Sequence, residues 1–145
     1  MAALPWTSGP AAIEAARSGA RRTDTPGAEH GPALVFASRL RLRRWRDIPA
    51  FLRWSMQVRA VAASSPGCLG VTLDARVLSR TFFTLSTWVD DDALASFVRT
   101  DVHAAAMHRW ASALGEARFE RWLGDPRPSW RDARGRLTTQ ASASM

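Results

Sequence analysis

Residues 81–110 carry side chains whose types and spacing are suited to chemistry. Trp88 ends an alternating run, Ser86 precedes it on the same side, and His103 follows in a helix-like run. Histidine titrates near neutral pH, so His103 can act as a general base or a hydrogen-bond donor. A base, a hydroxyl and an aromatic wall predict a small-molecule pocket with His103, Trp88 and Ser86 as candidate catalytic residues. The alternative is packing alone, with Trp88 filling an interface and His103 bonded to backbone or a fixed polar group.

Hydroxyl groups alternate with apolar side chains on the strand faces that should point inward. Ser38, Thr84 and Ser86 occupy such positions. Burying a hydroxyl without a partner costs about 1–3 kcal/mol, so these groups should meet water, a ligand or each other. Exposure to solvent would explain them as well. The candidate substrate-binding residues lie on these inner faces and on the helix that should face them: Phe36, Ser38, Phe82, Thr84, Met107 and Trp110.

Other kinds of site lack their sequence signatures. The chain has no Ser-His-Asp order in a local motif and no glycine loop for phosphate. His103 and His108 lie five residues apart, about 140° around a helix, so they do not easily share a metal ion. The three Asp residues at 90–92 place negative charge where a helix N-terminus favours it, which predicts a cap and not catalytic carboxylates. We expect no metal and no cofactor.

The composition is that of a globular chain that fits one domain. It has 145 residues, 46% of them hydrophobic, and a formal charge of +7. Cys68 is the only cysteine, which predicts a small buried hydrophobe in a cytoplasmic protein without an intramolecular disulfide. No apolar run reaches the ~18 residues of a membrane span, so we expect no membrane partner. A basic run is either a solvated strand edge or an anion site: Arg39, Arg41, Arg43, Arg44 and Arg46.

The elements that position these residues follow from apolar spacing. Alternation with a period of two predicts strands, and apolar residues three and four apart predict helices. We expect strands at 33–43, 67–76, 80–89 and 116–124, a helix from the Asp47 cap to about residue 64, and a helical region at 90–114 with a break near Thr100–Asp101. One stripe of that region should be buried, with His108 and Arg109 exposed: His103, Met107, Trp110 and Leu114.

The order βαββαβ predicts a ferredoxin-like α+β fold with a four-stranded antiparallel sheet and helices on one face. We expect a flexible N-terminal arm at residues 1–31 with a short helix at 10–18, a folded domain at 32–125, and a partly disordered C-terminal extension at 126–145. The opposite face of the sheet is then open. It must be covered by another subunit, a ligand or a nucleic acid.

An RNA-recognition module has the same element order and stacks bases on its open sheet. The strand "RTFFTLSTW" lacks the glycines of the module's RNP1 pattern, and the connection between the second and third strands is short. A nucleic acid is therefore the least favoured of the three partners.

A dimeric α+β barrel is the other way to use the open face, because two subunits then press their sheets together. The chain resembles the antibiotic-biosynthesis monooxygenase group of that superfamily in "SPGCLG" and "TFFTLSTWVDDDALASF", followed by His103 after the break. It is also similar to a bacterial family of uncharacterised domains in the same superfamily, in "HAAAMHRW" and "FERWLGDPRPSWRDARGRL". Together these matches cover residues 33–137.

The resemblance implies a homodimer and a small-molecule enzyme of secondary metabolism. The expected activity is that of a cofactor-independent monooxygenase or a cyclase, on an apolar or aromatic substrate between Trp88 and the His103 helix. His103 would be the base and Ser86 would hold an enolate. The alternative is a non-catalytic dimer that binds a hydrophobic ligand or haem.

The haem alternative depends on whether this sequence has the residues of the haem-degrading branch of the superfamily. Trp88 matches the tryptophan that lies over the haem there, but alignment places Met107 at the ligand histidine. Ser38 is the polar residue nearest to the expected asparagine. Haem is therefore kept only as an alternative cofactor.

Overall fold

The computed structural model describes residues 2–19 and 32–143. The helices and strands are β1 Ala2–Ala3, β2 Thr7–Ser8, α1 Pro10–Gly19, β3 Ala33–Leu42, η1 Trp45–Asp47, α2 Ile48–Ala63, β4 Cys68–Arg76, η2 Val77–Ser79, β5 Thr81–Trp88, α3 Asp91–Val98, α4 Asp101–Trp110, β6 Leu114–Gly124 and α5 Trp130–Ala143. None of the helices in these ranges has the length and apolar character that a membrane span requires.

The long strands form an antiparallel sheet in the order β4-β5-β3-β6. This order is that of a ferredoxin-like βαββαβ unit, and it confirms the predicted fold class. Strands β1 and β2 extend the sheet because both pair with β4. Strands β4 and β5 form an antiparallel hairpin, and η2 is the short connection expected from the sequence.

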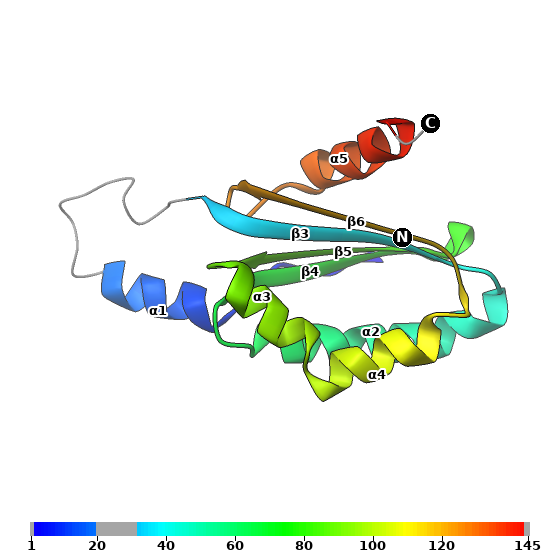
Figure 1. Ribbon diagram of the computed structural model, residues 1–145, viewed down its shortest axis with the longest axis horizontal. Helices are drawn as coiled ribbons and strands as arrows, with labels where there is room; N and C mark the ends of the chain where they lie inside the picture. Colours follow the sequence, from blue (N-terminus) through cyan, green and yellow to red (C-terminus); the bar gives the residue numbers. More distant parts are fainter. Residues whose placement is uncertain (1, 20–31, 144–145) are drawn as a thin grey trace.

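Helices α2, α3 and α4 lie on one face of the sheet, as predicted (Figure 1). We call this the helix-side face. On β3 it carries the even-numbered residues from Leu34 to Leu42, and on β5 those from Phe82 to Trp88. Successive side chains of a strand point to opposite faces, so the candidate site residues of both strands share this face.

The opposite face carries α5, which the sequence left unassigned (Figure 1). Ala133 and Leu137 of α5 are buried against one apolar cluster of the sheet, formed by Val35, Ala37 and Leu85. Burial of this apolar surface holds the helix in place. The sheet face that was expected to be open is therefore covered in part, and residues 130–143 of the predicted C-terminal extension form a helix.

An ion pair supports this packing of α5. The Asp74 carboxylate on β4 is buried and is contacted by the guanidinium of Arg134 on α5 and by Arg76 at 3.3 Å. A buried carboxylate needs such partners because it has lost its water.

Residues 2–19 of the predicted N-terminal arm form β1, β2 and α1. Besides the pairing of β1 and β2, the Thr72 hydroxyl donates to the Leu4 carbonyl oxygen at 2.6 Å. The predicted short helix is present as α1. The remaining residues of the predicted arm, 20–31, lie outside the described part of the chain.

Several local predictions need correction. The Asp47 side chain makes no cap hydrogen bond. At the predicted break, Thr100 caps α4 by accepting from the His103 backbone N–H at 3.4 Å. Asp90 does cap α3, accepting from the Ala93 N–H at 2.8 Å. Helix α4 ends at Trp110, and Leu114 begins β6 instead of continuing the stripe.

Strand β4 begins with an irregularity that changes which of its residues face the helices. The pairing with β5 shifts between Cys68 and Gly70, so Cys68 and Val71 lie in the same helix-side cluster, while Leu69 is not part of it. Cys68 is fully buried, as expected for a small hydrophobe, and this burial raises the pKa of its thiol to about 11.

Candidate functional site

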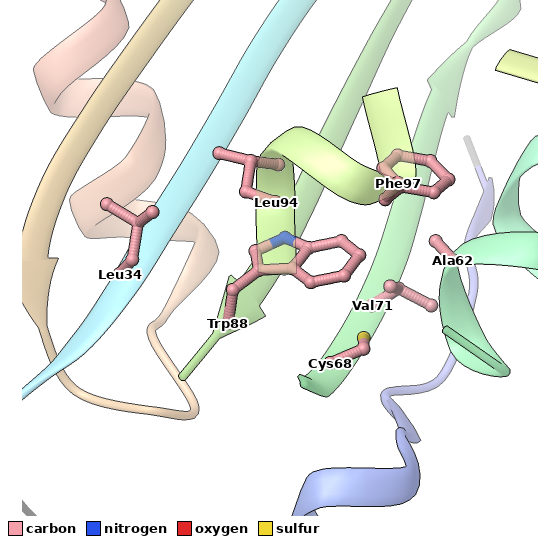
Figure 2. Packing of buried hydrophobic residues seen from close by; sticks show 7 residues of the cluster. All are labelled: Leu34, Ala62, Cys68, Val71, Trp88, Leu94 and Phe97. Atoms are coloured by element: carbon pink, nitrogen blue, oxygen red, sulfur yellow. The ribbon is translucent and has the colours of Figure 1, made fainter. Parts of the chain in front are cut away.

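One aromatic cluster joins Trp88 to His103. Trp88 is 0% exposed and stacks on Phe97 of α3, with ring centroids 5.2 Å apart. Phe97 in turn meets the His103 ring of α4 at 4.9 Å, in an edge-to-face arrangement. Figure 2 shows the Trp88 indole at the end of β5, beside Leu94 and Phe97. Trp88 therefore belongs to the core between sheet and helices within one subunit, and Phe97 connects it to the histidine.

A second aromatic cluster lies further along the same face. Phe51 of α2 contacts both Phe82 of β5, at 4.7 Å between centroids, and Trp110 of α4, at 5.1 Å. Phe82 and Trp110 are buried. The Trp110 indole Nε1 is also buried, and it has no hydrogen-bond partner among the described residues. A buried donor without a partner is costly, which makes this atom a candidate to bind water or a ligand.

The hydroxyls of Ser38 and Thr84 lie between the two clusters. The register of β3 and β5 pairs Phe36 with Ser86, then Ser38 with Thr84, then Leu40 with Phe82. The middle pair is joined by a hydrogen bond between the two hydroxyls. This bond fulfils the expectation that such groups meet each other. Two hydroxyls have two hydrogens and their mutual bond uses one, so the other remains for a third partner.

Ser86, on the same face of β5, is hydrogen-bonded to Trp88. Its Oγ accepts a hydrogen bond from the Trp88 Nε1–H at 2.9 Å. Its own hydroxyl is 3.5 Å from the Phe36 carbonyl oxygen, at the upper limit for a hydrogen bond. The Ser86 hydrogen is thus weakly held and can turn to a ligand oxygen, while the Trp88 contact fixes the position of Oγ.

His103 is half-buried, and its Nδ1 lies 3.2 Å from the Val98 carbonyl oxygen. Because a carbonyl only accepts, Nδ1 carries the proton of the neutral ring and Nε2 keeps its lone pair. Desolvation lowers the pKa of His103, with the Val98 contact acting in the opposite direction. The backbone bond is the one that the packing interpretation expected. The geometry also leaves a neutral imidazole whose Nε2 can accept a proton.

The outer border of the face is formed by β6. Phe119 is 52% exposed and stacks on Phe36 with centroids 5.9 Å apart. The register also places Phe119 beside Ser38. Arg121, two residues further on, forms an exposed ion pair of 2.9 Å with Asp91 of α3. The exposed Phe119 side chain therefore lies next to the Ser38–Thr84 pair, and a ligand could reach this side chain from solvent.

The sequence did not single out Phe97 or Phe119. Phe97 falls within the helical region predicted at 90–114, but its role as the link between Trp88 and His103 depends on the angle between α3 and α4. Phe119 could have been found from the alternation in "EARFERWLG", since it shares a strand face with residues 117, 121 and 123.

The predicted buried stripe of α4 is only partly correct. Trp110 is buried, His103 is half-buried, and His108 and Arg109 are exposed as expected. Met107 is 54% exposed, because the half-buried residue at this level of the helix is Ala106. Met107 is thus not brought together with the other candidate residues.

The residues at the haem positions do not fit a haem group. Met107 occupies the position where the resemblance requires the ligand histidine. Ser38 occupies the position of the expected asparagine, and its hydroxyl is hydrogen-bonded to Thr84. The chemistry proposed below therefore contains no step through haem. Among the described residues, no three His, Cys, Asp or Glu side chains gather in a way that would hold a metal ion.

Solved structures share the fold of this chain at low sequence identity. No protein-family model matches the chain, and no curated protein matches it. A Nitrosomonas europaea protein proposed to be an antibiotic biosynthesis monooxygenase is 12% identical with a TM-score of 0.60, over 65% of this chain and 91% of that one. A Caulobacter crescentus protein with the same proposed activity is 21% identical with a TM-score of 0.56, over 63% and 89%.

A variant of SnoaB, a cofactor-independent oxygenase from Streptomyces nogalater, is 15% identical with a TM-score of 0.55, over 68% of this chain and 96% of that one. Nearly the whole of each of these proteins is therefore matched, while about a third of this chain has no counterpart in them. Likeness at such identities establishes the fold. The chain has the ferredoxin-like α+β fold of the antibiotic biosynthesis monooxygenase-like proteins.

Proposed function

We propose that this protein is a small-molecule enzyme of the monooxygenase-like kind, with an apolar, aromatic substrate bound at the helix-side face. The observation that carries the proposal is the position of Ser38 and Thr84 between two aromatic clusters. Ligand sites are typically apolar with a few placed polar groups. The likeness in fold to a cofactor-independent oxygenase supports the same reaction class.

His103 is the proposed base. Its neutral form has a lone pair on Nε2 and a proton on Nδ1 that is held by Val98. A phenolic or enolic substrate loses a proton to this nitrogen, and the resulting anion is electron-rich enough to reduce oxygen itself. The protein's contribution is then the base, the orientation of the substrate and the stabilisation of its negative charge.

The hydroxyls are proposed to stabilise that charge. Ser86 is held by Trp88 and keeps a weakly bound hydrogen, and the Ser38–Thr84 pair has one hydrogen to donate. Donors placed where negative charge develops contribute more in a dry site than in water. Phe36, Phe82 and Trp110 are proposed to contact the substrate rings. Met107, because it is exposed, is withdrawn from the substrate-contacting set.

The proposal is tested by oxygen uptake with a panel of polycyclic phenols, without added cofactor. We expect uptake by the wild-type protein, and a loss of about 100-fold or more in His103→Gln, the scale of general-base catalysis. His108→Gln is the matched control, because His108 is exposed on the same helix and should retain full activity. Equal rates in both variants would overturn the assignment of the base.

The alternatives give different results in the same assay. Binding of the phenols without oxygen uptake by any variant would favour a non-catalytic ligand-binding protein. An RNA-binding function is disfavoured because bases would stack on the sheet face that carries α5. This helix covers the apolar part of that face.

We further propose that the protein is a homodimer, on the basis of the sequence resemblance, and that it acts in the cytoplasm, on the basis of its single cysteine. Since α5 covers one part of the sheet face, a second copy would use the remaining part near Arg39 and Glu116, which form an ion pair of 2.9 Å. Sedimentation equilibrium tests this, and a monomer at all protein concentrations would contradict it.

A further inference from the structure

Two exposed turns lie side by side at one end of the sheet. The first is the segment 43–47 that follows β3 and contains η1, and the second is residues 77–80, which contain η2. The Leu42 N–H donates to the Arg80 carbonyl oxygen at 2.9 Å, and the Arg80 guanidinium lies 5.5 Å from the centre of the Trp45 ring. Both turns are at the right-hand end of Figure 1, away from α1 and α3. We call these residues the tip.

The tip exposes large apolar side chains. Leu78 is 87% exposed, Trp45 is 51% exposed, and Val77 beside Leu78 is exposed as well. Leu78 is the most exposed large hydrophobic side chain in the described part of the chain. Neighbouring apolar side chains at a protruding turn cost free energy in water, so they indicate an interaction surface more than scattered single residues do.

The tip also carries an excess of positive charge, with four arginines and one acidic residue, Asp47. The four arginines of the tip form no ion pair with any described residue: Arg43, Arg44, Arg46 and Arg80. By contrast, Arg39, four residues before the first of them, is paired with Glu116 at 2.9 Å. Arg43 uses its Nε to donate to the Leu114 carbonyl oxygen at 3.1 Å, which fixes its stem but leaves the charge. The partner of this surface should therefore be anionic.

We propose that the tip binds the surface of an anionic lipid bilayer. Leu78 and Val77 would enter the boundary between headgroups and acyl chains, Trp45 would lie at the headgroup level, and the arginines would meet lipid phosphates. A nucleic acid fits less well, because aliphatic side chains offer it no hydrogen bonds and Arg80 already covers the Trp45 ring. The proposal is independent of the proposed enzymatic function.

The expectation of no membrane partner came from the lack of a spanning segment. A peripheral contact needs no span, since a few apolar side chains and a basic cluster can hold a folded protein at the interface. The lipid surface is thus compatible with the described helices, none of which could cross a bilayer.

The test is co-sedimentation of the full chain with vesicles of phosphatidylcholine alone or mixed with phosphatidylglycerol. We expect binding to the mixed vesicles, weaker binding as salt rises, and little binding to phosphatidylcholine alone. In Leu78→Ser/Arg46→Ser the partition coefficient should fall at least fivefold, since one arginine near an anionic surface is worth about fivefold.

The matched control is Ile13→Ser/Arg127→Ser, which makes the same kind of changes at exposed positions away from the tip. It should bind the vesicles like the wild type. Equal binding to both kinds of vesicle, or equal loss in both double variants, would overturn the proposal. So would loss of self-association in Leu78→Ser/Arg46→Ser by sedimentation velocity, or binding of a single-stranded oligonucleotide through the tip with no vesicle binding, because the surface would then belong to a second copy or to a nucleic acid.

Discussion

Ser86 accepts the hydrogen bond of an indole N–H on a ring that is fully buried. In Ser86→Ala the Trp88 Nε1–H keeps its place in the core but loses its acceptor. Leaving a buried donor without a partner costs about 1–3 kcal/mol, and we expect the free energy of unfolding to fall by that amount in a urea titration.

Two companion variants separate this bond from other effects of the substitution. Ser96→Ala on α3 is exposed and should change the stability little. In a Trp88→Phe background, Ser86→Ala should cost much less than in the wild type, because the donor is already gone. An equal cost in both backgrounds would show that the Ser86–Trp88 bond does not stabilise the fold.

At the scale of single elements, Gly67 forms the junction before β4 and has a positive φ of 83°. A Cβ there would lie 2.4 Å from the Ala93 Cβ of α3. Both the backbone and the contact therefore favour glycine. We expect Gly67→Ala to destabilise the protein by about 1–3 kcal/mol in chemical denaturation.

Gly135 in α5 provides the opposite case. A Cβ at this position meets no atom within 4 Å. Gly135→Ala should therefore raise the stability by about 0.5–1 kcal/mol through helix propensity. A stabilising Gly67→Ala, or a strongly destabilising Gly135→Ala, would contradict the described junction and the described helix respectively.

The elements that the sequence could predict are those with a clear period. The alternation in "ALVFASRLRL" and "TFFTLSTW" placed β3 and β5 within one or two residues, and with them the face shared by Ser38, Thr84 and Ser86. Their mutual bonds could not be predicted, because they depend on the register between strands far apart in the chain.

Helix α5 was missed although a signal was present. Trp130, Ala133 and Leu137 have helical spacing, and all three belong to the cluster on the sheet. The polar end "LTTQASASM" led instead to the prediction of a partly disordered extension. Likewise β1 and β2 have only two residues each, too short for any period, and exist because β4 offers them an edge.

The whole molecule has one sheet with apolar surface on both faces, and α5 covers the second. A chain that ends at Pro128 should expose Val35, Ala37 and Leu85 and leave Asp74 without Arg134. We expect this truncated chain to self-associate more strongly than the full chain in sedimentation velocity, and to unfold at lower urea concentration. Unchanged association and stability would mean that α5 does not protect this face in solution.

The central claim is that His103 acts as the base at the helix-side face, and the pH dependence of kcat/KM for oxygen uptake tests it most directly. Desolvation lowers the pKa of His103 below its ordinary value of 6.5. The base is active when neutral, so the rate should rise with pH, reach half its plateau below pH 6.5 and stay flat above it. The residual activity of His103→Gln should lack this acid limb. A midpoint above pH 6.5, or an acid limb that persists in His103→Gln, would contradict the account.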